Sequence, residues 1–332
     1  MKQVVIAFCL VAGLPGISHS QASGRTECPG PYLGQEPPGD SPVLFAPGII
    51  STGYHEDGGP AFTLDWTEIY FRIAQGPYPT IFYMSEVGGV WSVPQTAPFS
   101  GKYSDGDPYI TNDGLRLFFA SYRPLSGDDE PRPDEDIWYL NRDGDTWGEP
   151  IRLSSPVNLD ESDEWKVSLS RNGNLYFTSN RKDKAAWRIY CSKWKTDEFE
   201  EPFEFDEQIN DAYHPACPCI SEDESFLVFT SSKEPGRRLD LFVTFRTKDG
   251  NWSSPMNLGE PVNSSRDELY PVLSPDSRYL FFTSWRSDFP GYSTEQKSYA
   301  DFVKLYNSPS NGRGGDIYWV SAKIIEELRP KE

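Results

Sequence analysis

The 332-residue sequence is poor in basic residues, histidine, methionine and cysteine. It has 31 Lys and Arg against 50 Asp and Glu, which gives a formal net charge of −19. A nucleic-acid-binding surface needs clustered basic charge, so we expect no nucleic-acid partner. The sequence also lacks a Gly-rich phosphate loop, a Gly-x-Ser-x-Gly elbow and a His-Glu-x-x-His zinc motif, so three common kinds of catalytic site are excluded.

Long hydrophobic runs are lacking except near the N-terminus. There, Lys2 precedes an apolar run from Val4 to Leu14, and small residues follow as far as Ala22. This order is typical of a cleavable secretory signal, and the run is shorter than the roughly 20 apolar residues that cross a bilayer. We therefore expect a mature chain that starts near Ser23, has no membrane span, and is secreted or periplasmic.

Aromatic residues, glycine and proline are abundant. The 10 Trp, 18 Tyr and 20 Phe are far too many for a disordered acidic chain. The 27 Gly and 29 Pro are spread along the whole length, where they would interrupt long helices but suit short strands joined by turns. This composition predicts an all-β fold.

Five segments of the chain share one pattern. They align on a Ser or Thr, and the residue three positions earlier is Pro in four copies and Val in one. The aligned residues are Thr63, Thr111, Ser170, Ser221 and Ser274, preceded by Pro60, Pro108, Val167, Pro218 and Pro271. A repeat of this kind is the signature of an architecture built from one repeated unit.

The complete pattern of one copy predicts four strands. The first strand is short. The second strand is rich in aromatic residues and usually ends Ser-x-basic, as at Ser179-Asn180-Arg181. A third strand follows, for example from Asp136 to Leu140. After a turn such as Asp143-Gly144, a fourth strand opens with Trp-x-x-Pro, as at Trp147 to Pro150. Four antiparallel strands make one propeller blade, so the sequence predicts a five-bladed β-propeller.

The fifth copy lacks its Trp-x-x-Pro strand, and the N-terminal part of the mature chain supplies a match. The segment from Gly39 aligns with the fourth strand that starts at Trp147, so we expect an N-terminal strand to complete the C-terminal blade and close the ring. The predicted parts are a signal peptide 1–22, an N-terminal tail 23–38, a single propeller domain 39–332 with closing strand 39–50 and blades at about 57–102, 103–160, 161–210, 211–263 and 264–322, and a C-terminal tail 323–332.

These motifs resemble a known family. Ser-Pro-Asp-Ser at Ser274 to Ser277, the turn from Asn112 to Gly114, the Ser-x-Arg strand ends and Asp-Ile-Tyr from Asp316 are similar to the TolB-type, WD-like β-propeller repeat. The resemblance covers about 85% of the mature chain. It implies a fold shared by periplasmic proteins that bind protein partners or small ligands and by the propellers of some peptidases. We expect no attached hydrolase domain after Asp316.

A ring of acids marks the face on which a site is expected. Six positions before each aligned Ser or Thr the sequence has a carboxylate in four copies, and the copy without one has His214 nearby. In a blade, the loop that enters the inner strand and the loop that joins the second strand to the third open on the same face. Two of the loops between second and third strands are long insertions, from Pro124 to Glu135 and from Ser287 to Gly315, and long loops often bind ligands. The predicted ligand-binding face comprises Asp57, Asp105, Glu164, His214, Glu268 and Trp285.

Three interpretations of this ring remain open. The acids accept backbone N–H bonds in tight turns and are inert; or they bind a cationic group or a metal such as Ca²⁺; or they hydrolyse glycosides, by analogy with other five-bladed propellers. The metal set would be Asp57, Asp105, Asp107, Glu164 and Glu268, and the catalytic set Asp57, Asp107 and Glu164. We favour a non-enzymatic binding module for a protein partner or a small polar or cationic ligand, with a carbohydrate-active enzyme as the alternative.

The cysteines that remain after signal cleavage are disulfide candidates. Cys28, Cys191, Cys217 and Cys219 make an even number in an oxidising compartment. Cys217 and Cys219 are separated by one residue on a predicted strand, so they point to the same face and are poorly placed to bond each other. One or two bridges that involve Cys191 or Cys28, or buried thiols, are the expectation. They are favoured over a metal site on Cys217-Pro218-Cys219, because only two histidines, His55 and His214, remain in the mature chain.

Ion pairs within each blade are also expected. The basic residue that ends a second strand faces an acid that starts the third strand in three copies. The predicted pairs are Arg123 with Asp136, Lys233 with Asp240, and Arg286 with Asp316.

Overall fold

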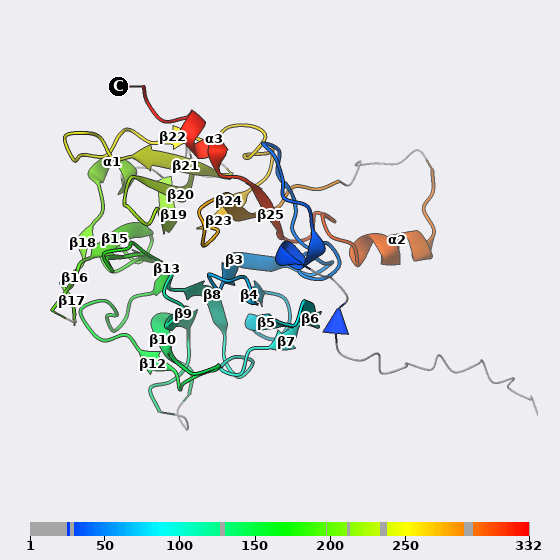
Figure 1. Cartoon of the computed structure of the whole chain (residues 1–332), viewed down its shortest axis with the longest axis horizontal. Helices are drawn as coiled ribbons and strands as arrows, with labels where there is room; N and C mark the ends of the chain where they lie inside the picture. Colours follow the sequence, from blue (N-terminus) through cyan, green and yellow to red (C-terminus); the bar gives the residue numbers. More distant parts are fainter. Residues whose placement is uncertain are drawn as a thin grey trace, which may run out of the picture.

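The computed structural model describes residues 25–26, 30–126, 130–196, 198–210, 213–232, 238–288 and 295–331. Five small antiparallel sheets stand in a ring, in the order of the sequence, and form a five-bladed propeller (Figure 1). The all-β prediction and the blade number are confirmed.

Each blade has four strands that run from the central channel outward. The inner strands are β3 (Glu56–Phe62), β8 (Asp105–Ile110), β13 (Glu164–Leu169), β19 (Tyr213–Ile220) and β23 (Glu268–Leu273). The second strands are β4 (Glu68–Ile73), β9 (Arg116–Ser121), β14 (Leu175–Ser179), β20 (Phe226–Ser232) and β24 (Tyr279–Ser284). The third strands are β5 (Thr80–Val87), β10 (Asp136–Asp143), β15 (Arg188–Ser192), β21 (Leu239–Phe245) and β25 (Asp316–Ser321). The outer strands are β7 (Gln95–Thr96), β12 (Ile151–Arg152), β18 (Phe203–Glu204), β22 (Met256–Asn257) and β2 (Val43–Leu44).

The Trp-x-x-Pro segment forms two short strands rather than one. In blade two, β11 (Thr146–Trp147) pairs with the far end of β10, and β12 then pairs with the middle of β10. Pro150 lies between them, and proline has no N–H to donate to a ladder, so the strand breaks there. In blade one the segment forms β6 (Val90–Ser92), which also pairs with β1 (Arg25–Thr26). In blade three it forms β17 (Glu198–Phe199), which pairs with β16 (Trp194–Lys195), and in blade four Trp252 makes a single bridge with Arg246.

The ring is closed by the N-terminal segment, as predicted. In blade five Val43 pairs with Trp319, and in blade two the equivalent Ile151 pairs with Tyr139. Ser51 secures this closure, because its hydroxyl donates to the carbonyl of Ile317 at 3.0 Å and accepts from the N–H of Ile317. The sheet edge of blade five is thereby covered, and the first and last blades belong to one ring.

Aromatic side chains pack between neighbouring blades and form the core. At the junction of blades five and one, Phe45, Phe281 and Trp319 are fully buried and Phe62 is nearly so. The short helix η1 (Pro31–Gly34) adds Tyr32 and Leu33 to this cluster. Part of the predicted N-terminal tail therefore contributes to the core.

The described residues contain three α-helices outside the sheets. They are α1 (Glu207–Asn210), α2 (Tyr299–Tyr306) in the blade-five insertion, and α3 (Lys323–Glu327) at the C-terminal end of the described chain. The side chain of Ile325 in α3 is buried, so part of the segment expected as a tail packs on blade five. Among the described residues no helix is long and apolar enough to cross a membrane.

Candidate functional site

Three acids of the predicted ring, Asp105, Glu164 and Glu268, make structural contacts inside their own blades. Asp105 is fully buried at the start of β8 and accepts hydrogen bonds from the hydroxyl of Ser121 at 2.6 Å and the guanidinium of Arg123 at 2.8 Å. Arg123 also bonds Ser121 through Nε and lies 4.5 Å from the ring centre of Phe119. The Ser-x-Arg strand end therefore supplies two donors to one buried carboxylate.

Blades three and five repeat this arrangement. Glu164 accepts from Ser179 at 2.6 Å and lies 3.3 Å from Arg181. In blade five the same three contacts join Glu268, Ser284 and Arg286. Burial raises the pKa of Glu164 and of Glu268, opposed by these hydrogen bonds and charges.

The predicted ion pairs of Arg123 and Arg286 are wrong. Arg123 pairs with Asp105, and Asp136 is held instead by Arg152 at 2.7 Å. Arg286 pairs with Glu268 rather than Asp316. Each guanidinium turns inward to the first strand of its own blade, where it neutralises a buried carboxylate. The third predicted pair involves Lys233, which lies outside the described residues.

In blade one the equivalent carboxylate is Glu56, not Asp57. Glu56 is fully buried and accepts from Thr52, and burial raises its pKa to about 7. The bulge of β3 is one residue longer than that of β8, since four residue steps separate the paired Asp57 and Ala61. Asp57 is thereby displaced by one position, and its carboxylate lies 3.3 Å from Arg72.

A second ring of residues, directly before the repeated Pro or Val, surrounds the central channel. Every inner strand carries a bulge, and a residue with positive φ stands there. These residues are Gly59, Asp107, Lys166, Cys217 and Tyr270. A left-handed residue in a bulge re-aims its side chain, so four different functional groups converge on the channel axis. At Gly59 a Cβ atom would stand 2.7 Å from Cγ2 of Val272, so the closely packed channel leaves no room for a side chain.

A funnel of about 770 Å³ opens above this ring. Its walls come from the loops that enter the inner strands and from the loops that join second to third strands. These loops lie on the face where the sequence analysis expected a site. The charged and polar wall residues include Arg72, Asp107, Glu135, Asp163 and His214, and the aromatic ones are Tyr122, Trp165, Trp187 and Tyr270.

Opposite charges meet at Asp107, which lines the funnel. Nζ of Lys166 lies 3.9 Å from Oδ1 of Asp107 and donates to the carbonyl of Gly58. Burial raises the pKa of Asp107, while Lys166 and Arg72 oppose that rise. Burial, with repulsion from Asp107, raises the pKa of Glu135 to about 8, so at neutral pH its carboxyl is mostly protonated and is a hydrogen-bond donor.

Four polar atoms of the wall residues lack hydrogen-bond partners. Oδ1 of Asp107, Nε of Arg72, Nε1 of Trp165 and Oγ1 of Thr230 make no hydrogen bond within the part of the chain that the structure describes. Asp107 is only 3% exposed, and a buried polar group without a partner costs about 1–3 kcal/mol. The funnel therefore combines an acceptor, two donors and a hydroxyl that a ligand could satisfy.

The predicted site residues are divided between three places. Asp107 and His214 line the funnel. Asp57 does not line it, but its carboxylate contacts the guanidinium of Arg72, which does. Trp285 packs on His55 with the ring centres 5.0 Å apart, and His55 in turn lies 3.6 Å from Asp57. Asp105, Glu164 and Glu268 are in the buried contacts described above.

Sequence reasoning missed Arg72, Glu135, Lys166, Trp165 and Tyr270 as site residues. The signal for two of them was present, because Lys166 and Tyr270 precede the repeated Val167 and Pro271. The positive φ of that position was not apparent, since neither residue type is one that favours it.

No group of three or more His, Cys, Asp or Glu side chains in the described ranges is placed to hold a metal ion. The five carboxylates of the predicted Ca²⁺ set are therefore not brought together. Three of them are buried between Ser and Arg side chains, each in a different blade.

Three of the four disulfide candidates form no bridge among the described residues and are buried thiols, the alternative expected for them. Cys191, Cys217 and Cys219 are free and buried, because the bulge of β19 places Cys217 at the channel and Cys219 in the core between blades four and five. Burial raises the pKa of the Cys217 thiol to about 12. Cys28 lies outside the described residues.

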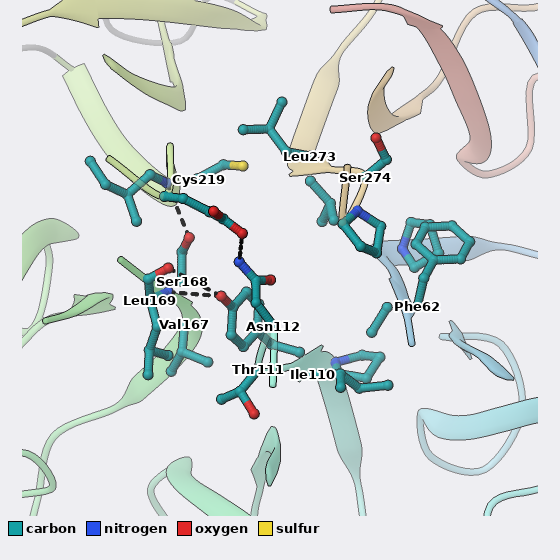
Figure 2. Close-up of a pocket in the computed structure, with 18 of the residues that line it drawn as sticks. Phe62, Ile110, Thr111, Asn112, Val167, Ser168, Leu169, Cys219, Leu273 and Ser274 are labelled. Carbon is teal, nitrogen blue, oxygen red and sulfur yellow. Dashed lines mark hydrogen bonds between the residues drawn. The ribbon is translucent and has the colours of Figure 1, made fainter. Parts of the chain in front are cut away.

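The opposite end of the channel is narrow and mostly apolar. Its pocket of about 60 Å³ is lined by Phe62, Ile110, Val167 and Leu273 together with the repeated prolines (Figure 2). Hydrogen bonds between blades tie this end together, from Asn112 to Glu222 and from the N–H of Ile220 to the hydroxyl of Ser168. The wide funnel, rather than this end, is the candidate site.

Comparison with known proteins shows the fold alone. No protein-family model and no curated protein matches the chain. A putative TolB from Agrobacterium tumefaciens has a TM-score of 0.47 and 16% identity, covering 70% of this chain and 72% of that one. An α-L-arabinofuranosidase from Lactobacillus brevis has a TM-score of 0.48 and 12% identity over 81% and 91% of the two chains. A gluconolactonase from Xanthomonas campestris has a TM-score of 0.44 and 13% identity over 90% and 99%. These similarities to TolB propellers and to other proteins are distant, and the β-propeller fold of this chain follows from its own five sheets. One fold of this kind can carry different functions.

Proposed function

We propose that the protein is an exported binding module that holds a small polar ligand in the funnel. The observation that carries this proposal is the buried, unpartnered Oδ1 of Asp107 at the floor of a cavity of about 770 Å³. A cavity of this size with a few convergent polar groups among aromatic side chains is typical of small-molecule sites. The apolar run from Val4 to Leu14 supports export, with cleavage near Ser23.

Glycoside hydrolysis is the second candidate, and Glu135 favours it. A hydrolase of this kind needs one protonated carboxyl and one ionised carboxylate on either side of the bond. Glu135, with its pKa raised to about 8, and Asp107 line the same funnel. Glu164, the acid first assigned to this role, is fully buried between Ser179 and Arg181, so the enzyme would use Glu135 in its place.

Thermal unfolding of the exported protein with a panel of ligands tests the proposal. The panel holds neutral oligosaccharides, an oligogalacturonate, spermidine and Ca²⁺, each at millimolar concentration. A ligand that binds the folded state raises the melting temperature by mass action, and Asp107→Asn should abolish the rise. If no member of the panel raises the melting temperature, a small-ligand site is contradicted and a protein partner becomes the better account. Release of new reducing ends from a sugar that binds would favour the enzyme.

A further inference from the structure

We infer that the ligand of the funnel is an uncharged, polyhydroxylated molecule, a saccharide, held by Asp107, Arg72 and the aromatic wall around Trp165. This inference rests on the proposed binding function and names the chemistry of the ligand. Three properties of the funnel support it: its balance of charge, its mixture of hydrogen-bonding groups, and its aromatic wall.

The basic groups in and next to the funnel wall already have acidic neighbours. The guanidinium of Arg72, which lines the funnel, lies 3.3 Å from Asp57, and the ammonium of Lys166 lies 3.9 Å from the wall residue Asp107. An anionic ligand would meet the carboxyl groups of Asp107 and Asp163, and a cationic ligand would meet the guanidinium of Arg72. A buried charge that lacks its own counter-charge is costly, so a neutral ligand fits this floor best.

The unpartnered atoms differ in kind, and this determines what the ligand must offer. Oδ1 of Asp107 accepts hydrogen bonds, whereas Nε of Arg72 and Nε1 of Trp165 donate them. A ligand group that only donates, such as a protonated polyamine, or only accepts, such as a fully ionised phosphate monoester, would leave part of this set unpaired. A sugar hydroxyl both donates and accepts, and neighbouring hydroxyls on one ring can satisfy both kinds of group.

Aromatic rings stand around these polar groups. Trp165 and Trp187 meet edge to face with ring centres 5.3 Å apart, and Tyr270 lies 6.1 Å from Trp165. All three line the funnel. The C–H faces of a sugar ring are apolar, so they pack against aromatic rings while the hydroxyl edge reaches the polar floor.

Calorimetric titration of the exported protein tests the inference. The neutral probes are xylotetraose, arabinotetraose, cellotetraose and maltotetraose, and the charged probes are trigalacturonate and spermidine. We expect at least one neutral probe to bind and both charged probes to bind at least tenfold more weakly or not at all. Asp107→Asn should weaken the neutral probe by about tenfold or more, since an amide NH₂ replaces one of the two carboxyl oxygens. Asparagine tolerates the left-handed backbone at this position, with φ of 51°, so the variant is expected to fold.

Two further variants locate the effect. Trp165→Ala should weaken the neutral probe by a similar factor, because it removes both a ring surface and a donor. Asp249→Asn makes the same charge change as Asp107→Asn at an exposed turn and should leave the affinity unchanged.

The possible failures are distinguishable. If trigalacturonate or spermidine binds and no neutral probe does, the inference is overturned while the proposed binding function stands. Binding of a neutral probe that neither Asp107→Asn nor Trp165→Ala weakens also overturns the inference, since the sugar would then be held elsewhere. If no probe binds, both the inference and the proposed function fail.

Discussion

The guanidinium of Arg123 lies 2.8 Å from the carboxylate of Asp105, inside its own blade and almost out of contact with solvent. The side chains are 8% and 0% exposed, and Ser121 bonds both partners. The same triad in blades three and five shows that the Ser-x-Arg strand end joins the second strand to the start of the first. This contact explains the repeated motif without a catalytic role.

Replacing Arg123 with methionine should therefore destabilise the fold. Asp105 would remain as a buried charge without its partner, which costs about 3–5 kcal/mol. Urea unfolding should show this loss. The matched change Arg171→Met removes an exposed pair with Glu222, where Arg171 is 71% exposed, and should cost less than about 1 kcal/mol. Equal losses for the two variants would contradict the structural role of the triad.

Ring closure depends on Phe45, which follows the closing strand. Its ring is fully buried against Phe62, Phe281 and Trp319. Phe45→Ala should lower the free energy of unfolding by about 3–5 kcal/mol, because a cavity remains where the blades meet. Val43 lies in the closing strand itself but is 39% exposed, so it serves as the control. Val43→Ala should have a much smaller effect when both variants are unfolded with urea. A small loss for Phe45→Ala would show that the N-terminal segment does not hold the ring closed.

Glu135 should make stability fall as pH rises. Its pKa is raised to about 8 in the folded protein, against about 4.5 when unfolded. The unfolded chain therefore loses this proton first, and the stabilisation present below pH 4.5 is lost progressively as pH rises to about 8. Glutamine resembles the protonated carboxyl, so Glu135→Gln should melt higher than the parent protein at pH 8 and nearly the same at pH 4.5. Melting curves across this range test the difference, and a constant gap between the two proteins would contradict the assignment.

The thiols of Cys191, Cys217 and Cys219 should be unreactive in the folded protein. All three are buried, and burial raises their pKa values, to about 12 for Cys191 and Cys217 and to about 11 for Cys219. The thiolate is the reactive form, so Ellman's reagent at neutral pH should label them only in denaturant. Rapid labelling of native protein, or a disulfide between any two of them in a non-reducing peptide map, would contradict this arrangement.

Much of the architecture could be predicted because each repeat is one structural unit. The four-strand pattern, the number of blades and the pairing of the segment from Gly39 with the last blade all follow from aligned motifs. The site was predicted less well. The ring of acids was identified from the repeat. In blade one, however, the bulge is one residue longer, so Glu56 occupies the position that was assigned to Asp57. Pairwise alignment on Thr63 cannot show an extra residue inside a bulge.

The sequence by itself determined the ring of five blades, its closure and the face on which the loops gather, since these depend on local strand patterns repeated at nearly constant spacing. Only the tertiary structure decided which side chains meet at the channel. Asp107, Lys166 and Tyr270 face one another because bulges turn three inner strands in the same way, and Arg72 arrives from a second strand. Such convergence depends on backbone torsion and on packing across blades, and neither is encoded in the spacing of one repeat.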